Sequence, residues 1–156
     1  MKCSNCGADL IEGNAFCTRC GTPVKKMKEA VAEELRPYID AMNIDLKCFN
    51  SDYYQKVLKG DLGTTKRFIE KALTFSHVEL TTLIIPGEND SEEEMRELSA
   101  WVHELELVYE KGIPLHITRF FPRSAYSDRT PTSMASILHL AEVAREQLPF
   151  VYEGNI

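Results

Sequence analysis

The stretch Val78-Glu-Leu-Thr-Thr-Leu-Ile-Ile-Pro-Gly87 decides the fold. It is rich in β-branched and aliphatic residues and stops at Pro-Gly, which predicts a strand. A polar turn, Glu88-Asn-Asp-Ser91, then leads into a helical pattern. The apolar end of the strand, residues 83–85, does not alternate with polar residues, so we expect burial on both faces, as in parallel sheets flanked by helices. Such sheets bind ligands at the carboxyl ends of their strands, which makes residues 86–91 the expected ligand loop.

The segments on both sides of this stretch alternate between helical and strand patterns. Apolar residues at helical spacing predict helices over residues 29–39, 51–74, 91–111 and 131–147. Strand-forming runs lie at residues 41–49, 78–85, 115–121 and 150–156. This order predicts right-handed crossovers and a parallel sheet, an α/β fold. We expect Ser91 or Asp90 to cap the third helix, and Thr130 to cap the last helix with Pro131 in its first turn.

Charge divides the chain into two units. The 156 residues carry a net charge of −6, but residues 1–28 hold five basic and two acidic side chains, which leaves −9 for the rest. We therefore expect a module at residues 1–24, a basic linker at 25–28 and an α/β domain at 29–156. An acidic protein is not attracted to nucleic acid or to anionic membranes, so neither is expected as a general partner. No signal peptide or membrane-spanning run is visible, which predicts a cytoplasmic protein.

Four of the five cysteines form two Cys-x-x-Cys-Gly motifs, with ten residues between Cys6 and Cys17. Two residues between thiolates let both sulfurs reach one ion, and the following glycine permits the tight turn around it. The ligands are therefore expected to be Cys3, Cys6, Cys17 and Cys20. Four sulfurs close the coordination sphere, so the zinc is expected to be structural. The alternative is a redox dithiol, although redox pairs usually occur singly within a βαβ unit.

Four motifs in unbroken order carry a resemblance to one family. They are Tyr38-Ile-Asp-Ala-Met-Asn-Ile-Asp-Leu-Lys47, Thr81-Thr-Leu-Ile-Ile-Pro-Gly-Glu-Asn-Asp-Ser91, Pro114-Leu-His-Ile-Thr-Arg-Phe-Phe-Pro122 and Val151-Tyr-Glu-Gly-Asn155. Residues 29–156 resemble the carboxyl-terminal half of radical S-adenosylmethionine enzymes of the AmmeMemoRadiSam type, relatives of the pyruvate formate-lyase activating enzymes. Residues 1–24 resemble the zinc ribbons found at many prokaryotic amino termini. The resemblance implies part of a TIM-type (β/α) barrel that binds S-adenosylmethionine.

The family's cluster motif is missing from this chain. Members hold a 4Fe-4S cluster with Cys-x-x-x-Cys-x-x-Cys, and the sequence contains no such spacing and no Gly-Gly-Glu segment for the cofactor's methionine amine. A 4Fe-4S cluster is therefore not supported by these cysteines. The resemblance implies a half-barrel completed by a second polypeptide or a second copy, inactive alone. The alternative is a non-catalytic zinc-ribbon adaptor with a degenerate remnant of the fold.

The resemblance also implies cofactor-binding residues. Asp45 and Lys47 match the family's Asp-x-Lys, in which the lysine contacts the cofactor, and Asn43 lies on the same face of its strand. The alternative for Asp45 and Lys47 is a surface ion pair, which contributes little to stability.

Further positions near the cofactor lie on the second and third strands. Thr82, Ile84 and Ile85 are candidates for the adenine side, with Asn89 and Asp90 in the following loop, against the alternative of a core strand and a helix cap. Arg119 is a pocket candidate, because a buried arginine needs an anionic partner. For His116, a hydrogen-bonded core histidine is the favoured interpretation.

Overall fold

The computed structural model describes residues 6–9, 17–20 and 26–156. Four strands, β1 (Ala41–Asp45), β2 (His77–Ile84), β3 (Leu115–Arg119) and β4 (Val151–Gly154), form one sheet in the order β1-β2-β3-β4. All three neighbouring pairs are parallel. Sequential parallel order is the order of strands in a (β/α) barrel and differs from the doubly wound order, in which the direction reverses. The parallel α/β fold is therefore confirmed.

Helices separate the strands, as the sequence predicts. They are α1 (Lys26–Leu35), α2 (Ser51–Lys56), α3 (Leu62–Leu73), α4 (Glu92–Tyr109) and α5 (Met134–Arg145). Short 3-10 turns occur at η1 (Arg36–Tyr38), where Pro37 ends the regular helix, and at η2 (Ser124–Tyr126). The Ser91 hydroxyl caps α4 by accepting from the Glu94 N–H at 3.2 Å, and three glutamates fill the first turn. None of the helices in the described ranges is both long and apolar enough to cross a membrane.

The last helix begins later than the sequence suggests. Its cap is Ser133, not Thr130, and Pro131 lies outside it. The reason is Thr132, which is fully buried and donates its hydroxyl to the Ile84 carbonyl at 2.6 Å. Its N–H also donates to the Phe120 carbonyl at 3.1 Å. These contacts hold the chain extended beside β3 and delay the helix.

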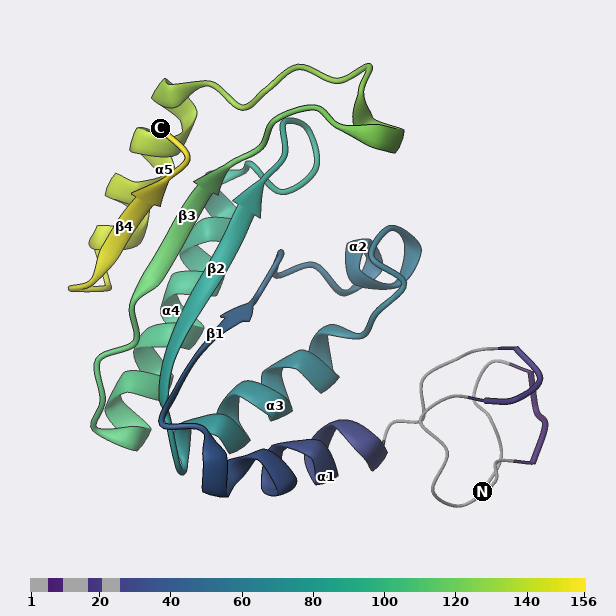
Figure 1. Ribbon diagram of the computed structural model, residues 1–156. Helices are drawn as coiled ribbons and strands as arrows, with labels where there is room; N and C mark the ends of the chain where they lie inside the picture. The colour runs from purple at the N-terminus through teal and green to yellow at the C-terminus, as the bar shows by residue number, and fades with distance from the viewer. Residues whose placement is uncertain (1–5, 10–16, 21–25) are drawn as a thin grey trace.

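One face of the sheet carries all of the packed helices. Side chains from α3, α4 and α5 form a single core with the strand residues beneath them, among them Ile69, Leu98, Leu140, Leu80 and Ile117. Figure 1 shows α4 and α5 behind the sheet and no helix of residues 26–156 in front of it. We call the uncovered side the open face.

Burial along β2 contradicts the expectation of two covered faces. The strand alternates, with Val78, Leu80, Thr82 and Ile84 buried and the residues between them half-buried. Leu83 is half-buried on the open face, although the sequence around it reads as continuously apolar. The prediction was wrong because residues 26–156 supply helices for one side of the sheet only.

Candidate functional site

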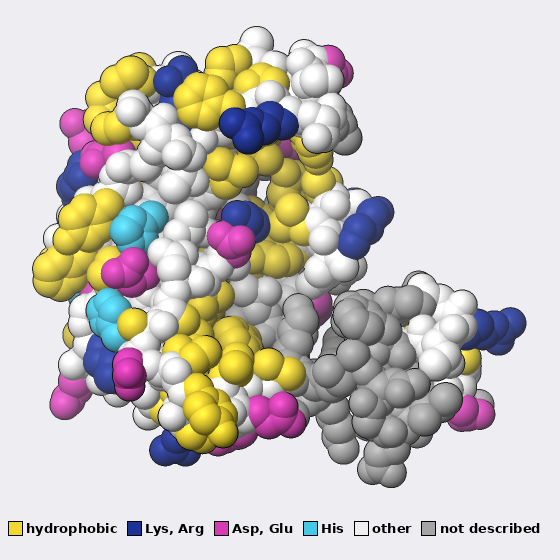
Figure 2. All heavy atoms as spheres, in the orientation of Figure 1, with side chains coloured by type: hydrophobic (Ala, Val, Ile, Leu, Met, Phe, Trp, Pro, Cys, Tyr) yellow, Lys and Arg dark blue, Asp and Glu magenta, His cyan; other side chains and the backbone are white. Residues whose placement is uncertain are grey.

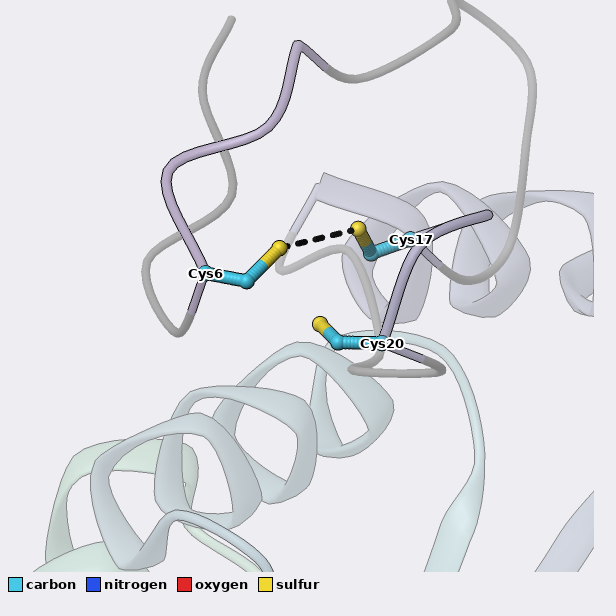
Figure 3. Close-up of side chains that lie close together, drawn as sticks. All are labelled: Cys6, Cys17 and Cys20. Carbon is cyan, nitrogen blue, oxygen red and sulfur yellow. Dashed lines mark hydrogen bonds between the residues drawn. The ribbon is translucent and has the colours of Figure 1, made fainter.

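Three of the four expected zinc ligands lie together at the amino terminus. The sulfurs of Cys6, Cys17 and Cys20 are all within 4.8 Å of one another, and Cys6 Sγ lies 3.6 Å from Cys17 Sγ (Figure 3). A tetrahedral zinc with bonds of about 2.3 Å separates its sulfurs by about 3.8 Å, so this spacing fits zinc. The spacing is too long for a disulfide. Cys3, the fourth expected ligand, lies outside the described residues.

The turn after the first motif has the geometry that the sequence predicts. Gly7 follows Cys6 with φ of +69°, a conformation that strains any side chain. Cys17 is 2% exposed, so its sulfur is shielded from solvent. The donor set therefore fits a sulfur-ligated structural metal.

Cys48 is a different kind of cysteine. It is buried in the core of the α/β part, and its Sγ lies 3.5 Å from the Asn50 carbonyl, to which it donates. Burial raises the pKa of the Cys48 thiol to about 11. A thiol that stays protonated at neutral pH is not poised to ligate iron.

We expect Cys48 to resist alkylation in the folded protein. With a pKa of about 11, its thiolate fraction at pH 7.5 is more than about a hundredfold below that of a free cysteine. Mass spectrometry after iodoacetamide treatment of zinc-loaded protein should find Cys48 unmodified, and modified once urea unfolds the chain. Rapid labelling of Cys48 under native conditions would contradict the burial described here.

On the open face, the structure brings together three of the residues that the resemblance singles out. Lys47 Nζ lies 2.8 Å from Asp45 Oδ1 in an ion pair at the carboxyl end of β1. Asn43, two residues before Asp45 on the same face, accepts a hydrogen bond from the Thr81 hydroxyl at 2.7 Å. Side-chain exposure of 33% for Lys47 and 61% for Asp45 leaves the pair accessible from solvent.

Thr82 lies apart from that group. It is 2% exposed on the helix-covered face, and its hydroxyl donates to the Leu46 carbonyl at 2.7 Å. Ile85 is half-buried just after β2, where its N–H donates to Asn89 Oδ1 at 2.8 Å. The structure therefore does not bring Thr82 into contact with Asn43, Asp45 or Lys47.

Arg119 ends β3 at the same edge of the sheet. Its Nε donates to the Thr132 carbonyl at 2.5 Å, and its guanidinium lies 4.8 Å from the centre of the Phe121 ring. Within the described part of the chain, no carboxylate forms a salt bridge with Arg119, so a carbonyl and a ring take the place of the expected anionic partner.

Asn89 organises the loops at this edge. It is 5% exposed, and its amide donates to the Lys47 carbonyl at 2.7 Å and to the Leu83 carbonyl at 3.0 Å. Together with the bond from the Ile85 N–H, these contacts tie the end of β1 to the end of β2. Asn89 therefore fixes the backbone that presents Lys47.

Sequence reasoning missed a second polar group in the middle of the open face. Glu79 on β2 accepts a hydrogen bond from His116 on β3, with 2.9 Å between Oε2 and Nε2. The His116 ring stacks on Tyr152 of β4, with 5.5 Å between ring centres. Figure 2 shows histidine and acidic side chains over the strands on this face. The alternation of His77, Glu79 and Thr81 along β2 was the signal that could have indicated this group.

Comparison with known proteins gives different matches for the amino-terminal module and the α/β part. Residues 2–24 match the zinc-ribbon domain family. The amino terminus is a zinc-ribbon domain. Among solved structures, the chain is similar to a domain of pyruvate-formate lyase-activating enzyme from Bacteroides vulgatus, with a TM-score of 0.67 and 12% identity. That match covers 81% of this chain and 74% of the other. The α/β part thus has the fold of this activating-enzyme domain.

One curated relative is similar in sequence. The uncharacterized protein MJ0808 of Methanocaldococcus jannaschii is 36% identical over 120 residues, which is 76% of this chain. The same match covers 35% of the relative, so the chain spans about a third of its length.

Proposed function

We propose that the α/β part is the cofactor-binding, carboxyl-terminal half of a radical S-adenosylmethionine barrel. The observation that carries the proposal is the open face, on which an accessible Asp45–Lys47 ion pair ends a strand of a sheet with the activating-enzyme fold. Parallel sheets are usually covered on both faces, so an uncovered polar face at the carboxyl ends of the strands is suited to a ligand. In this proposal Lys47 contacts the cofactor, and Asn43 and Asp45 shape its surroundings.

The donor sets fit zinc and do not fit an iron–sulfur cluster. Zinc suits the close sulfurs of Cys6, Cys17 and Cys20, and it would stabilise the ribbon. A cluster would need thiolates beside the open face, whereas Cys48, the cysteine of the α/β part, is buried in the core under the helices and protonated. We therefore propose that the chain contributes a half-site and does not catalyse a reaction by itself.

A second polypeptide, or a second copy of this chain, would then complete the barrel. The sheet ends in two edge strands, β1 and β4, and exposed edges of parallel strands are usually protected. Every residue of β1 is exposed or half-buried, unlike those of β2. A covering partner would bury both this strand and the open face.

The proposal predicts that the zinc-loaded chain binds S-adenosylmethionine through Lys47. Isothermal titration should show that Lys47→Ala weakens binding at least about tenfold, because a charged hydrogen bond is lost. Lys56→Ala is the matched control, since Lys56 also pairs with an aspartate, Asp52 at 2.6 Å, but on the surface of α2. Equal binding by both variants would remove Lys47 from the site.

A non-catalytic zinc-ribbon adaptor is the second candidate function. The absence of a Cys-x-x-x-Cys-x-x-Cys motif from the sequence favours it. Anaerobic purification with zinc and iron analysis separates the two candidates. One zinc per chain with no binding of S-adenosylmethionine would favour the adaptor, and zinc together with Lys47-dependent binding would favour the half-barrel.

A further inference from the structure

The middle of the open face has an unusual composition for the inside of a (β/α) fold. Barrel interiors are filled by layers of bulky branched apolar side chains. Here the open-face positions level with Asp45 are polar on the other three strands, namely Thr81, His116 and Tyr152, and Asn43 and Glu79 lie one level below them. We call these residues the mid-sheet cluster: Asn43, Glu79, Thr81, His116 and Tyr152. Burying a polar group costs free energy unless a partner forms hydrogen bonds with it. Polar residues at these positions therefore indicate a polar occupant.

Hydrogen bonds join the cluster across the sheet. The Thr81 hydroxyl donates to Asn43 Oδ1 at 2.7 Å, and Asn43 Nδ2 donates to Glu79 Oε2 at 3.5 Å. His116 Nε2 donates to the same carboxylate oxygen at 2.9 Å, while His77 Nε2 lies 3.7 Å from the other oxygen. The register places Thr81, His116 and Tyr152 side by side on β2, β3 and β4. The side chains are thus held in place before any ligand binds.

Glu79 gives the middle of the open face a negative charge. Asp45 is balanced by Lys47 at 2.8 Å, whereas among the described residues the titratable groups paired with Glu79 are the imidazoles of His77 and His116. The hydrogen bond from His116 holds the pKa of Glu79 below its usual value, so the carboxylate is ionised. The Tyr152 ring lies beside this group, stacked on His116. Carboxylates and aromatic faces both attract cations.

We propose that the mid-sheet cluster is a binding site for a ligand that carries a protonated amine. Glu79 accepts the ammonium hydrogen bond, Asn43 Oδ1 supplies a second acceptor, and Tyr152 covers the site through its ring. This inference extends the proposed function, because it assigns a ligand class to the middle of the same face and gives Lys47 no part in amine recognition.

Titration with 1,4-diaminobutane, followed by NMR of the zinc-loaded chain at pH 7.5, tests the site. We expect shifts centred on Glu79, His116 and Tyr152, and no such shifts with butane-1,4-diol, which has the same length and no charge. Glu79→Gln should weaken diamine binding at least about tenfold. The matched control is Glu93→Gln, an exposed glutamate on α4.

Two results would overturn the proposal that the mid-sheet cluster binds an amine. One is the absence of shifts at the mid-sheet cluster up to about 50 mM diamine. The other is equal weakening by Glu79→Gln and Glu93→Gln, which would indicate attraction to the acidic surface as a whole. Lys47→Ala should not weaken diamine binding, although it weakens binding of S-adenosylmethionine in the proposed function. The two proposals can therefore fail separately.

Discussion

Replacing Cys17 with serine should abolish tight zinc binding and leave the α/β part folded. Cys17 is 2% exposed and lies within 3.6 Å of the Cys6 sulfur, so its loss removes a buried ligand from a site that needs four. Structural zinc in such small modules supplies about 10–16 kcal/mol of apparent binding free energy, which is also the folding free energy of the module. We expect zinc affinity to fall by more than about a hundredfold. Competition with a chromophoric chelator measures this loss.

The matched control is Cys48→Ser, which makes the same change in a cysteine that lies in the α/β core. This variant should keep one zinc per chain. Circular dichroism should show that Cys17→Ser preserves the main thermal transition, because the core of the described residues contains no side chain from the ribbon. Retention of zinc at wild-type affinity by Cys17→Ser would remove Cys17 from the ligand set.

Local patterns in the sequence were sufficient to predict the helices, the strands and the metal site. The Cys-x-x-Cys-Gly motifs carry their own geometry, and the structure places Cys6, Cys17 and Cys20 together as the spacing predicts. Four strand-forming runs separated by helical patterns likewise gave the parallel sheet. These features depend on neighbours within a few residues, where sequence signals are strongest.

Contacts between distant segments determine the features that could not be predicted from local sequence patterns. Thr130-Pro131 is a sound local start for a helix, but the bond from Thr132 to Ile84, 48 residues away, delays the start to Met134. The exposure of Leu83 depends on whether any element covers the open face, which no local pattern encodes. The pairing of Glu79 with His116 joins two strands whose register had to be known first.

Asn89 is the residue whose replacement should most disturb the edge of the sheet at which we propose that the cofactor binds. Asn89→Ala removes the side-chain partner of three partly buried backbone groups, namely the Ile85 N–H and the carbonyls of Lys47 and Leu83. An unsatisfied buried polar group costs about 1–3 kcal/mol, and some of the three will regain water, so we expect a loss of about 2–4 kcal/mol in the free energy of unfolding. Urea unfolding followed by circular dichroism measures it.

Asn50→Ala is the matched control, because the Asn50 side chain also bonds to the backbone, accepting two N–H bonds through its oxygen, but as the exposed cap of α2. Loss of such a cap costs about 1 kcal/mol. Asn89→Asp tests the two hydrogen bonds that the Asn89 amide donates. The aspartate keeps the oxygen that accepts from the Ile85 N–H, but it places a carboxylate oxygen against the carbonyls of Lys47 and Leu83. It should destabilise at least as much as Asn89→Ala. If both Asn89 variants cost no more than Asn50→Ala, the ends of β1 and β2 are held by the sheet itself, and Lys47 would be presented without the help of this side chain.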